Sequence, residues 1–261
     1  MLRAFSTAAT GMTAQQMMVD TIANNLANIN TSGFKRSQIN FQDLLYINMK
    51  EPGTEVASGI NSPSGLEIGS GVRAASTNKV FTTGEFENTG RPLDVAIAGG
   101  GFFQVTMPNG DTRYTRDGAM QVNANGELVT SSGYILEPAI SIPSDAVSVS
   151  IEKDGGVNVT GPDGTLTVVG TVQLAQFQNP SGLSSEGDNL YAETAASGTP
   201  TTGTAGEGQF GTLQSGFLEK SNVQMVTELV NLINAQRAYE INSRAIKAGD
   251  DMLRTANNIV R

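Results

Sequence analysis

The glycine run Gly99-Gly100-Gly101 is the first stretch whose composition suggests chemistry, because glycine-rich loops that follow strands can bind phosphate. A phosphate loop also needs a Lys-Ser or Lys-Thr pair and the N-terminus of a helix. Neither follows here, and the residues from Phe102 onward indicate another strand. The run therefore favours a tight turn or a close approach of two backbones.

Oxygen ligands that calcium prefers gather at Asp117, Asn123, Asn125 and Glu127. An EF-hand loop requires an acidic residue at its twelfth position, and this stretch has none. Asn125 is followed by Gly126, a pair that is typical of β-hairpin turns. The sequence therefore predicts a turn at this place and no metal site.

Two carboxylates at a fixed separation could hydrolyse a glycosidic bond, and Glu85, Glu87 and Asp94 lie near one another in the sequence. Nothing in their spacing distinguishes them from a solvated face. The chain has no His, Cys or Trp, which excludes a Ser-His-Asp triad, a Cys-His pair, a disulfide, and thiolate or imidazole metal sites. We therefore predict no catalytic residue, no metal and no cofactor.

The net charge of −9 is distributed unevenly along the chain. Residues 1–40 carry +2, residues 213–261 carry +1, and residues 41–212 carry −12. An acidic surface argues against nucleic acid as a partner. The sequence has no run of about 20 apolar residues, so we expect no membrane insertion. The N-terminal segment lacks the apolar region and cleavage site of a secretory signal peptide, so export would need a route that removes no signal.

The first of three zones that position these residues is residues 1–32, where a seven-residue apolar repeat predicts one helix. Gly33 is expected to end it, because glycine adopts the left-handed conformation readily. Asn24, Asn25 and Asn28 are more amides than one apolar seam can hide. We predict that they bond across helices and to neighbouring backbones in a packed assembly. The predicted apolar assembly positions of this helix are Leu2, Phe5, Met12, Val19 and Leu26.

The last zone has an apolar residue at every seventh position, which predicts a second and longer helix. The repeat comprises Leu218, Met225, Leu232, Tyr239, Ile246 and Leu253, and Ser221 and Asn222 are the expected N-cap residues. A helix of roughly 40 residues is about 60 Å long, which is typical of a coiled coil. The two helices could form a hairpin that covers the middle domain, or they could pair with each other and with other copies. The length favours the second arrangement.

The middle zone is predicted to be a β domain, an antiparallel sandwich or barrel-like structure. Turn signals such as Asn109-Gly110 and Asp163-Gly164 separate its strands. The expected strand regions are residues 95–98, 102–107, 112–122, 127–136, 147–151, 157–160 and 166–177. The predicted fold class is α+β, with long N- and C-terminal helices forming a coiled-coil-like domain beside the mainly β middle. The expected domains are residues 1–35 plus 217–261, a connector of residues 36–95 plus 192–216 with an extended loop at 46–72, and an outer β domain of residues 96–191.

Four blocks, in order along the chain, carry a family resemblance. Residues 23–36 (ANNLANINTSGFKR) and 229–247 (LVNLINAQRAYEINSRAIK) resemble the N- and C-terminal signatures of bacterial flagellar rod and hook proteins. Residues 93–105 (LDVAIAGGGFFQV) and 114–129 (YTRDGAMQVNANGELV) resemble the middle blocks of the longer members. One departure is Ser215, where relatives tend to have Gln before the glycine that precedes the last helix.

The resemblance implies a structural subunit of the flagellar basal body and no enzyme. In this family, copies polymerise into a rigid hollow helical tube that acts as drive shaft and export channel, with the terminal helices inside and the β domain outside. Chain length and the loop at 46–72 favour the distal rod, and a proximal rod or hook paralogue is the alternative within the family. The loop, with Tyr46, Pro52, Pro63 and Leu66, matches the segment thought to stiffen the rod.

The same resemblance implies the partners and the location. The partners are further copies of the chain, proximal rod and hook-side flagellar proteins, the P- and L-ring proteins, and the flagellar type III export apparatus. The location is the rod of the basal body, from periplasm to outer membrane. Because the free helices would expose apolar stripes, we predict that both ends are largely disordered until neighbouring copies complete their contacts. A competing class is a secreted enzyme that acts on peptidoglycan, which would need a cleft with paired carboxylates.

Overall fold

The computed structural model describes residues 2–53, 55–57, 60, 61 and 63–259. The chain divides into two compact units. The first contains Met1–Leu26, Ser37–Asn78 and Met225–Arg261, and the second contains Ala27–Arg36 and Lys79–Gln224. The predicted class, long helices from both ends of the chain and a mainly β middle, is confirmed.

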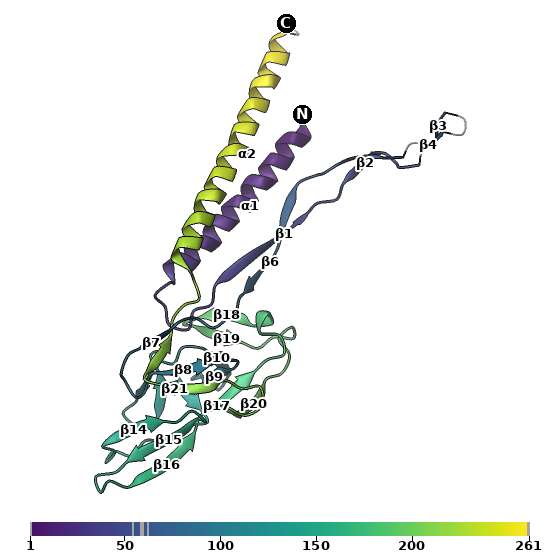
Figure 1. The fold of residues 1–261 in the computed structure, drawn as a ribbon. Coiled ribbons are helices and arrows are strands. Elements are labelled where there is room, and N and C mark those ends of the chain that lie inside the picture. The colour runs from purple at the N-terminus through teal and green to yellow at the C-terminus, as the bar shows by residue number, and fades with distance from the viewer. Residues whose placement is uncertain (1, 54, 58–59, 62, 260–261) are drawn as a thin grey trace. The chain divides into compact units, whose positions relative to one another are not determined.

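Two antiparallel helices, α1 (Leu2–Ala27) and α2 (Met225–Ile259), lie side by side in the first unit (Figure 1). Two close approaches fix their register. A Cβ added to Gly11 would lie 2.9 Å from Nδ2 of Asn242, and one added to Gly249 would lie 2.7 Å from Cζ of Phe5. Glycine at these two positions therefore allows the helices to pack closely.

A long antiparallel ribbon completes the first unit. Its outgoing strands are β1 (Ser37–Asp43), β2 (Ile47–Lys50) and β3 (Glu55–Ala57), and its returning strands are β4 (Ile60–Asn61), β5 (Leu66–Ile68) and β6 (Val72–Lys79). β1 pairs with β6, β2 with β5 and β3 with β4. The expectation of an irregular loop at residues 46–72 is therefore wrong. Its proline and glycine residues interrupt the alternation of each strand, so the sequence pattern there is too short to predict pairing.

Helix α1 ends at Ala27, earlier than the predicted stop at Gly33. The next residues form turns, in which the amide of Thr31 donates to Asn28 O and the amide of Phe34 donates to Thr31 O. Gly33 does have the expected positive φ, 67°. Its role differs, because a Cβ there would lie 2.6 Å from the carbonyl carbon of Arg116. Glycine is needed at this position for a close approach of two backbones.

Helix α2 begins at Met225, so the apolar repeat that starts at Leu218 crosses an element boundary. Leu218 lies in β22 (Phe217–Glu219), which pairs with β7 (Phe86–Asn88), and it is not a helix position. The expected N-caps are also wrong. Ser221 Oγ accepts a bond from the amide of Val223, and Asn222 Oδ1 accepts one from the amide of Arg36. Both bonds fix the segment before the helix.

A curled antiparallel sheet of nine strands forms the centre of the second unit (Figure 1). The central strand β9 pairs with β10 along one edge, and with β17 and β13 along the other. The strands of this sheet are β9 (Phe102–Thr106), β10 (Thr112–Thr115), β11 (Met120–Val122), β12 (Leu128–Thr130), β13 (Ile135–Glu137), β17 (Gln173–Gln176), β18 (Ser184–Gly187), β19 (Leu190–Ala192) and β20 (Thr201–Thr204). The remaining elements are β8 (Val95–Ala98), which pairs with β21 (Thr212–Ser215), the sheet of β14 (Ser148–Ile151), β15 (Gly156–Thr160) and β16 (Leu166–Thr171), and the 3-10 helix η1 (Pro180–Gly182).

Strand β9 is buried on both of its faces. Phe103 and Val105 belong to the main apolar core, which also contains Leu128 and Leu174. Phe102 points to the other face, where it joins a cluster of edge-to-face aromatic rings. That cluster comprises Phe81, Phe102, Tyr114, Phe177 and Tyr191. A large apolar core on one side of β9 and a smaller aromatic one on the other therefore hold the sheet.

The predicted strand regions of the β middle are confirmed, apart from breaks within the three longest. The predicted turns at Gly110, Gly126 and Gly164 are confirmed, since all three glycines have positive φ. The glycine run before β9 is the close approach that was expected, because a Cβ on Gly99 would lie 2.9 Å from Cα of Gly211. Gly118 is also a close approach, since a Cβ there would lie 1.7 Å from Val95 O.

We predict that Gly118→Ala lowers the free energy of unfolding by about 1–3 kcal/mol or more, because the added methyl group forces β8 and the chain around Gly118 apart. Urea unfolding of the full chain followed by tyrosine fluorescence measures this. Gly161→Ala is the matched control, since its Cβ would meet only Thr165, with Oγ1 at 3.5 Å and the backbone oxygen at 3.9 Å. Equal midpoints for the two variants would contradict the assignment.

Candidate assembly surfaces

The predicted seam of α1 is only partly buried within the described chain. Phe5, Met12, Val19 and Leu26 are half-buried, and the side chain of Leu2 lies outside the described residues. Ile22, from the same stripe, is almost fully buried. Of this stripe, Phe5 faces α2, since a Cβ on Gly249 would lie 2.7 Å from its Cζ, and contacts of the other positions with further copies stay a prediction.

Helix α2 presents a different face to α1 from the one that its apolar repeat predicted. Leu232 and Ile246 are half-buried, but Met225, Tyr239 and Leu253 are exposed. Small and polar residues occupy the inward positions instead. They include Glu228, Ala235, Asn242 and Gly249. That Met225, Tyr239 and Leu253 contact other copies stays a prediction.

The face of α2 that points away from α1 is apolar and bare. Val226, Val230, Ile233 and Ile241 recur at helical spacing, and their side chains are 75%, 51%, 49% and 65% exposed. Between them lies Arg237. A helix normally covers such a stripe, so this face has the character of an unfilled interface.

The three predicted asparagines have separate positions. Asn25 is buried, and its amide donates to Ser37 O at 2.9 Å and accepts from Ser37 N at 2.8 Å. It therefore fixes the start of β1 against α1 within one molecule, which corrects the expectation that its amide bonds to another copy. Asn28 Oδ1 accepts a bond from Thr31 Oγ1 in the turn after α1. Asn24 lies on the exposed side of the helix, so the prediction of contacts between copies stays open there.

The ribbon carries large apolar side chains that nothing in the described chain covers. Leu45, Tyr46, Met49 and Leu66 are 90%, 54%, 61% and 55% exposed. The ring of Tyr46 lies over Gly69, 3.5 Å from the position of an added Cβ. Pro52 and Pro63 are exposed as well.

A buried ion cluster holds together distant segments of the second unit. Lys35 Nζ lies 2.5 Å from Glu219 Oε1, and Arg116 binds Glu219 Oε2 at 3.2 Å. The amide of Gly84 donates to Glu219 Oε1 at 2.8 Å, and Lys35 Nζ also donates to Thr82 O at 2.8 Å. The side chains of Lys35 and Glu219 are fully buried.

Burial has an electrostatic consequence in this cluster. It lowers the pKa of Lys35 below its ordinary value, and the adjacent carboxylate of Glu219 opposes that shift. Burial likewise lowers the pKa of Arg116, again against the effect of Glu219. Each base is stabilised in its charged form by the single acid between them, so removal of that acid leaves two buried cations.

The sequence did not predict this ion cluster. One sequence signal in it is the spacing between Lys35 and a preceding serine. Ser32 and Lys35 have the Ser-x-x-Lys spacing of a serine nucleophile and its lysine base. The amino group of Lys35 is instead directed at Glu219 and Thr82. The contacts of Lys35 therefore support a structural role.

The acids considered for sugar hydrolysis do not form a matched pair. Glu85 and Glu87 are exposed, and Glu87 lies 3.4 Å from Lys220. Asp94 is buried beside Arg91, 3.7 Å away. In the stretch that was predicted to be a turn and not a calcium site, Asn123 Oδ1 accepts bonds from the amides of Asn125 and Glu127. Among the described residues no group of acids could hold a metal ion.

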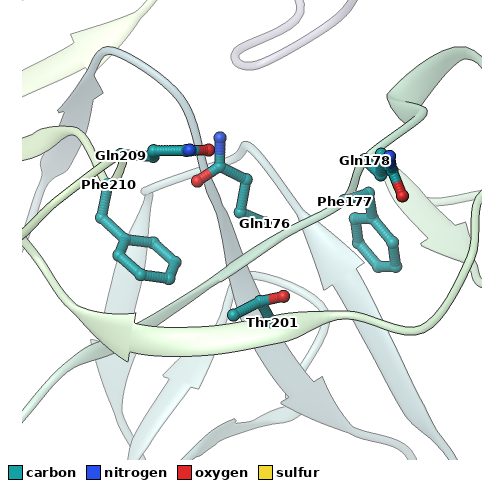
Figure 2. Close-up of a pocket in the computed structure, with 6 residues that line it drawn as sticks. All are labelled: Gln176, Phe177, Gln178, Thr201, Gln209 and Phe210. Carbon is teal, nitrogen blue, oxygen red and sulfur yellow. The ribbon is translucent and has the colours of Figure 1, made fainter.

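One pocket of the second unit is uncharged (Figure 2). It lies between β17, the start of β20 and the loop before β21, and a Cβ on Gly100 would lie 3.5 Å from Gln176 Nε2 at its edge. Its lining residues are Gln176, Phe177, Gln178, Thr201, Gln209 and Phe210. The glutamine and threonine side chains can donate and accept hydrogen bonds, the two phenylalanines offer only apolar surface, and none of the six titrates near neutral pH to act as acid or base. Elsewhere, neither helix has a described stretch that is both long and apolar enough to cross a bilayer.

Comparison with known proteins places these features in a family. Three protein-family profiles match, described as "Flagella basal body rod protein" at residues 5–35, "Flagellar hook protein FlgE/F/G D1 domain" at 96–159 and "Flagellar basal body rod FlgEFG protein C-terminal" at 214–259.

Relatives match over almost the whole chain. A flagellar basal-body rod protein FlgG of Buchnera aphidicola is 46% identical over 254 residues, 97% of this chain and 98% of its own. The FlgG of Borreliella burgdorferi is 44% identical over all of both chains. The flagellar hook-basal body complex protein FlhP of Bacillus subtilis is 35% identical over 99% of this chain and 100% of its own.

We predict that Glu219→Gln lowers the free energy of unfolding by about 3–5 kcal/mol, because Lys35 and Arg116 are left as buried charges. Glu87→Gln is the control, since its exposed pair with Lys220 contributes about 1 kcal/mol or less. Urea unfolding measures both variants. The double variant Lys35→Met/Glu219→Gln should lose less than the sum of its single variants, and strict additivity would contradict a coupled cluster.

Proposed function

Because the chain belongs to the flagellar basal-body rod protein family and is a structural subunit of the rod, we propose that it forms the distal rod. In this proposal copies assemble into a rigid hollow tube that is drive shaft and export channel. The terminal helices, residues 1–35 and 217–261, form the inner tube, and the β domain of residues 96–191 faces outward, with residues 36–95 and 192–216 as connector. Relatives named FlgG, similar over almost their whole length, support the distal assignment over a proximal rod or hook paralogue.

The bare apolar face of α2 is the observation that carries the proposal. Val226, Val230, Ile233 and Ile241 expose about half or more of their side chains to water. Burying each of them would contribute about 1.5–3 kcal/mol before the cost of ordering. A monomer gains nothing from this arrangement, whereas a polymer of identical copies covers the face in every subunit but the last.

A contact between two different surfaces, repeated by each copy, produces an open helical array, as a shaft requires. The expected location is the basal body, reached through the type III export apparatus without cleavage of a signal. Partners at the two ends would be proximal rod and hook-side proteins, and the P- and L-ring proteins would surround the outer domain. Folding of the terminal segments upon assembly would keep free subunits from polymerising early.

The ion cluster of Lys35, Arg116 and Glu219 suits a subunit that transmits torque. It fixes the segment that follows α1 to the strand that leads into α2, through buried charge-assisted bonds. Such bonds have a defined geometry, so they hold these segments in place within the second unit. The protein acts here as a structural element, and the contacts of its acids and of Lys35 support that reading over an enzyme.

We propose that the ribbon stiffens the tube. Its exposed Leu45, Tyr46, Met49 and Leu66 would pack against neighbouring subunits and so add contacts that resist sliding. A two-stranded ribbon alone is marginally stable in water, so it gains order from such contacts.

We expect the purified chain to form tubes at high concentration in electron micrographs, while a variant that lacks residues 1–30 stays monomeric because α2 loses its partner. Gly249→Leu should also impair tubes, since its side chain would collide with Phe5. Monomers of the unaltered chain at every concentration would contradict the proposed function. So would normal tubes from the truncated variant.

A chain without residues 46–68 should form tubes of markedly shorter persistence length, because the contacts of the ribbon are lost. Tyr46→Ser/Leu66→Ser is a milder variant that keeps the ribbon and removes two apolar contacts. Asn109→Ser, in an exposed turn of the second unit, is the control. Persistence length is measured from the curvature of tubes in micrographs. An unchanged persistence length for the deletion variant would contradict the stiffening role of the ribbon, but it would not contradict tube formation.

A further inference from the structure

Helix α1 is the middle layer of the first unit. On one side it contacts α2, through the pairs Phe5–Gly249 and Gly11–Asn242. On another side it contacts the ribbon, where Thr10 Oγ1 accepts a bond from the amide of Val72 and Asn25 binds Ser37. Figure 1 shows α1 between α2 and the paired strands β1 and β6. The two outer layers, α2 and the ribbon, therefore each keep a surface that α1 does not cover.

The surface left on α2 is the bare face of Val226, Val230, Ile233 and Ile241, with Arg237 among them. Three of these residues, 226, 230 and 233, follow the i, i+4, i+7 spacing of a helix that packs into a groove. The residues that approach α1, Asn242 beside Gly11 and Gly249 beside Phe5, lie on the other side of the helix. The bare face therefore cannot be covered by α1 of the same molecule.

The surface left beside the ribbon is a groove of about 340 Å³ between α1 and strands β1 and β6. Met17, which is 41% exposed, and Ile39 supply its large apolar side chains, and small residues line the β6 side. Asp20 is the one charged residue of the lining. The full lining is Met17, Asp20, Thr21, Ile39, Ala74, Ala75, Ser76 and Thr77.

We propose that the bare face of α2 in one copy packs into the α1–ribbon groove of a second copy, with Arg237 beside Asp20. Charge complementarity selects this occupant, because the stripe contributes a cation, Arg237, and the groove contributes a carboxylate, Asp20, which is the one charged residue of its lining. The small side chains of Ala74 and Ala75 let a helix approach the strand closely. The two surfaces differ, so each copy uses its α2 face to bind one neighbour and its groove to bind another. Such a contact can be repeated from copy to copy and does not end at a closed dimer. The inference rests on the proposed function and names the contact through which polymerisation occurs.

The absence of cysteine from the chain makes this contact directly testable. Ala75→Cys/Ile233→Cys should give a ladder of disulfide-linked multimers after mild oxidation, at a concentration at which the unaltered chain assembles. Ala75→Cys/Ser131→Cys is the control, with its second thiol in an exposed turn of the second unit, and it should give no ladder. Each single-cysteine variant should stop at dimers.

The outcomes separate this contact from the proposed function. Normal tubes without a ladder from the Ala75/Ile233 pair would overturn the contact and leave the function standing. If the unaltered chain never assembles, the result would contradict both the proposed function and the proposed contact. A ladder from the control pair as well would show unspecific oxidation and overturn the assignment.

Charge reversal gives an independent measurement in case the thiol variants assemble poorly. Asp20→Arg and Arg237→Asp should each raise the critical concentration for assembly by about tenfold, because two like charges then meet in the contact. The double variant Asp20→Arg/Arg237→Asp should return to within about threefold of the unaltered chain. Asp20→Arg/Arg254→Asp is the mismatched control, since Arg254 lies elsewhere on α2 beside Asp250, and it should not recover. Failure of the matched pair to recover would overturn the proposal.

Discussion

The second unit depends on one buried carboxylate, that of Glu219. Its two oxygens accept bonds from Lys35, Gly84 and Arg116, and its backbone carbonyl accepts one from the amide of Gly33. A buried acid of this kind is tolerated only when every lone pair is satisfied, so the surrounding backbone has little freedom to move. The segment after α1 and the strand before α2 are therefore fixed to the same point of the β unit. Positive φ at Gly33, where only glycine fits against the backbone of Arg116, completes this junction.

The first unit differs, because many of its large apolar side chains are left exposed to water. Its inner contacts use glycine, alanine and amides, such as Gly249 against Phe5 and Asn25 against Ser37. Its large apolar residues, including Val226 and Ile241 on α2 and Leu45 on the ribbon, face water. In the proposed polymer, burial of these side chains against other copies would add hydrophobic stabilisation that the single chain lacks.

The sequence predicted local structure well wherever one pattern coincided with one element. The strands of the β middle alternate between turn glycines, and most of them lie where the alternation indicated. Prediction failed where a pattern crossed an element boundary. The apolar repeat from Leu218 joins a strand to a helix, so its phase did not identify the inner face of α2. It failed again at residues 46–72, where proline and glycine interrupt strands whose pairing is decided by the partner strand.

What the sequence by itself determined was the type of protein: two terminal helices, a β middle, and a chain without the His and Cys that many active sites require. These properties follow from composition and from periodicity over neighbouring residues. Only the tertiary structure decided that Glu219 meets Arg116 and Lys35, which lie 103 and 184 positions away, and that α2 turns its apolar stripe away from α1. The physical reason is that burial and charge pairing depend on which distant segments meet, and no local pattern records that.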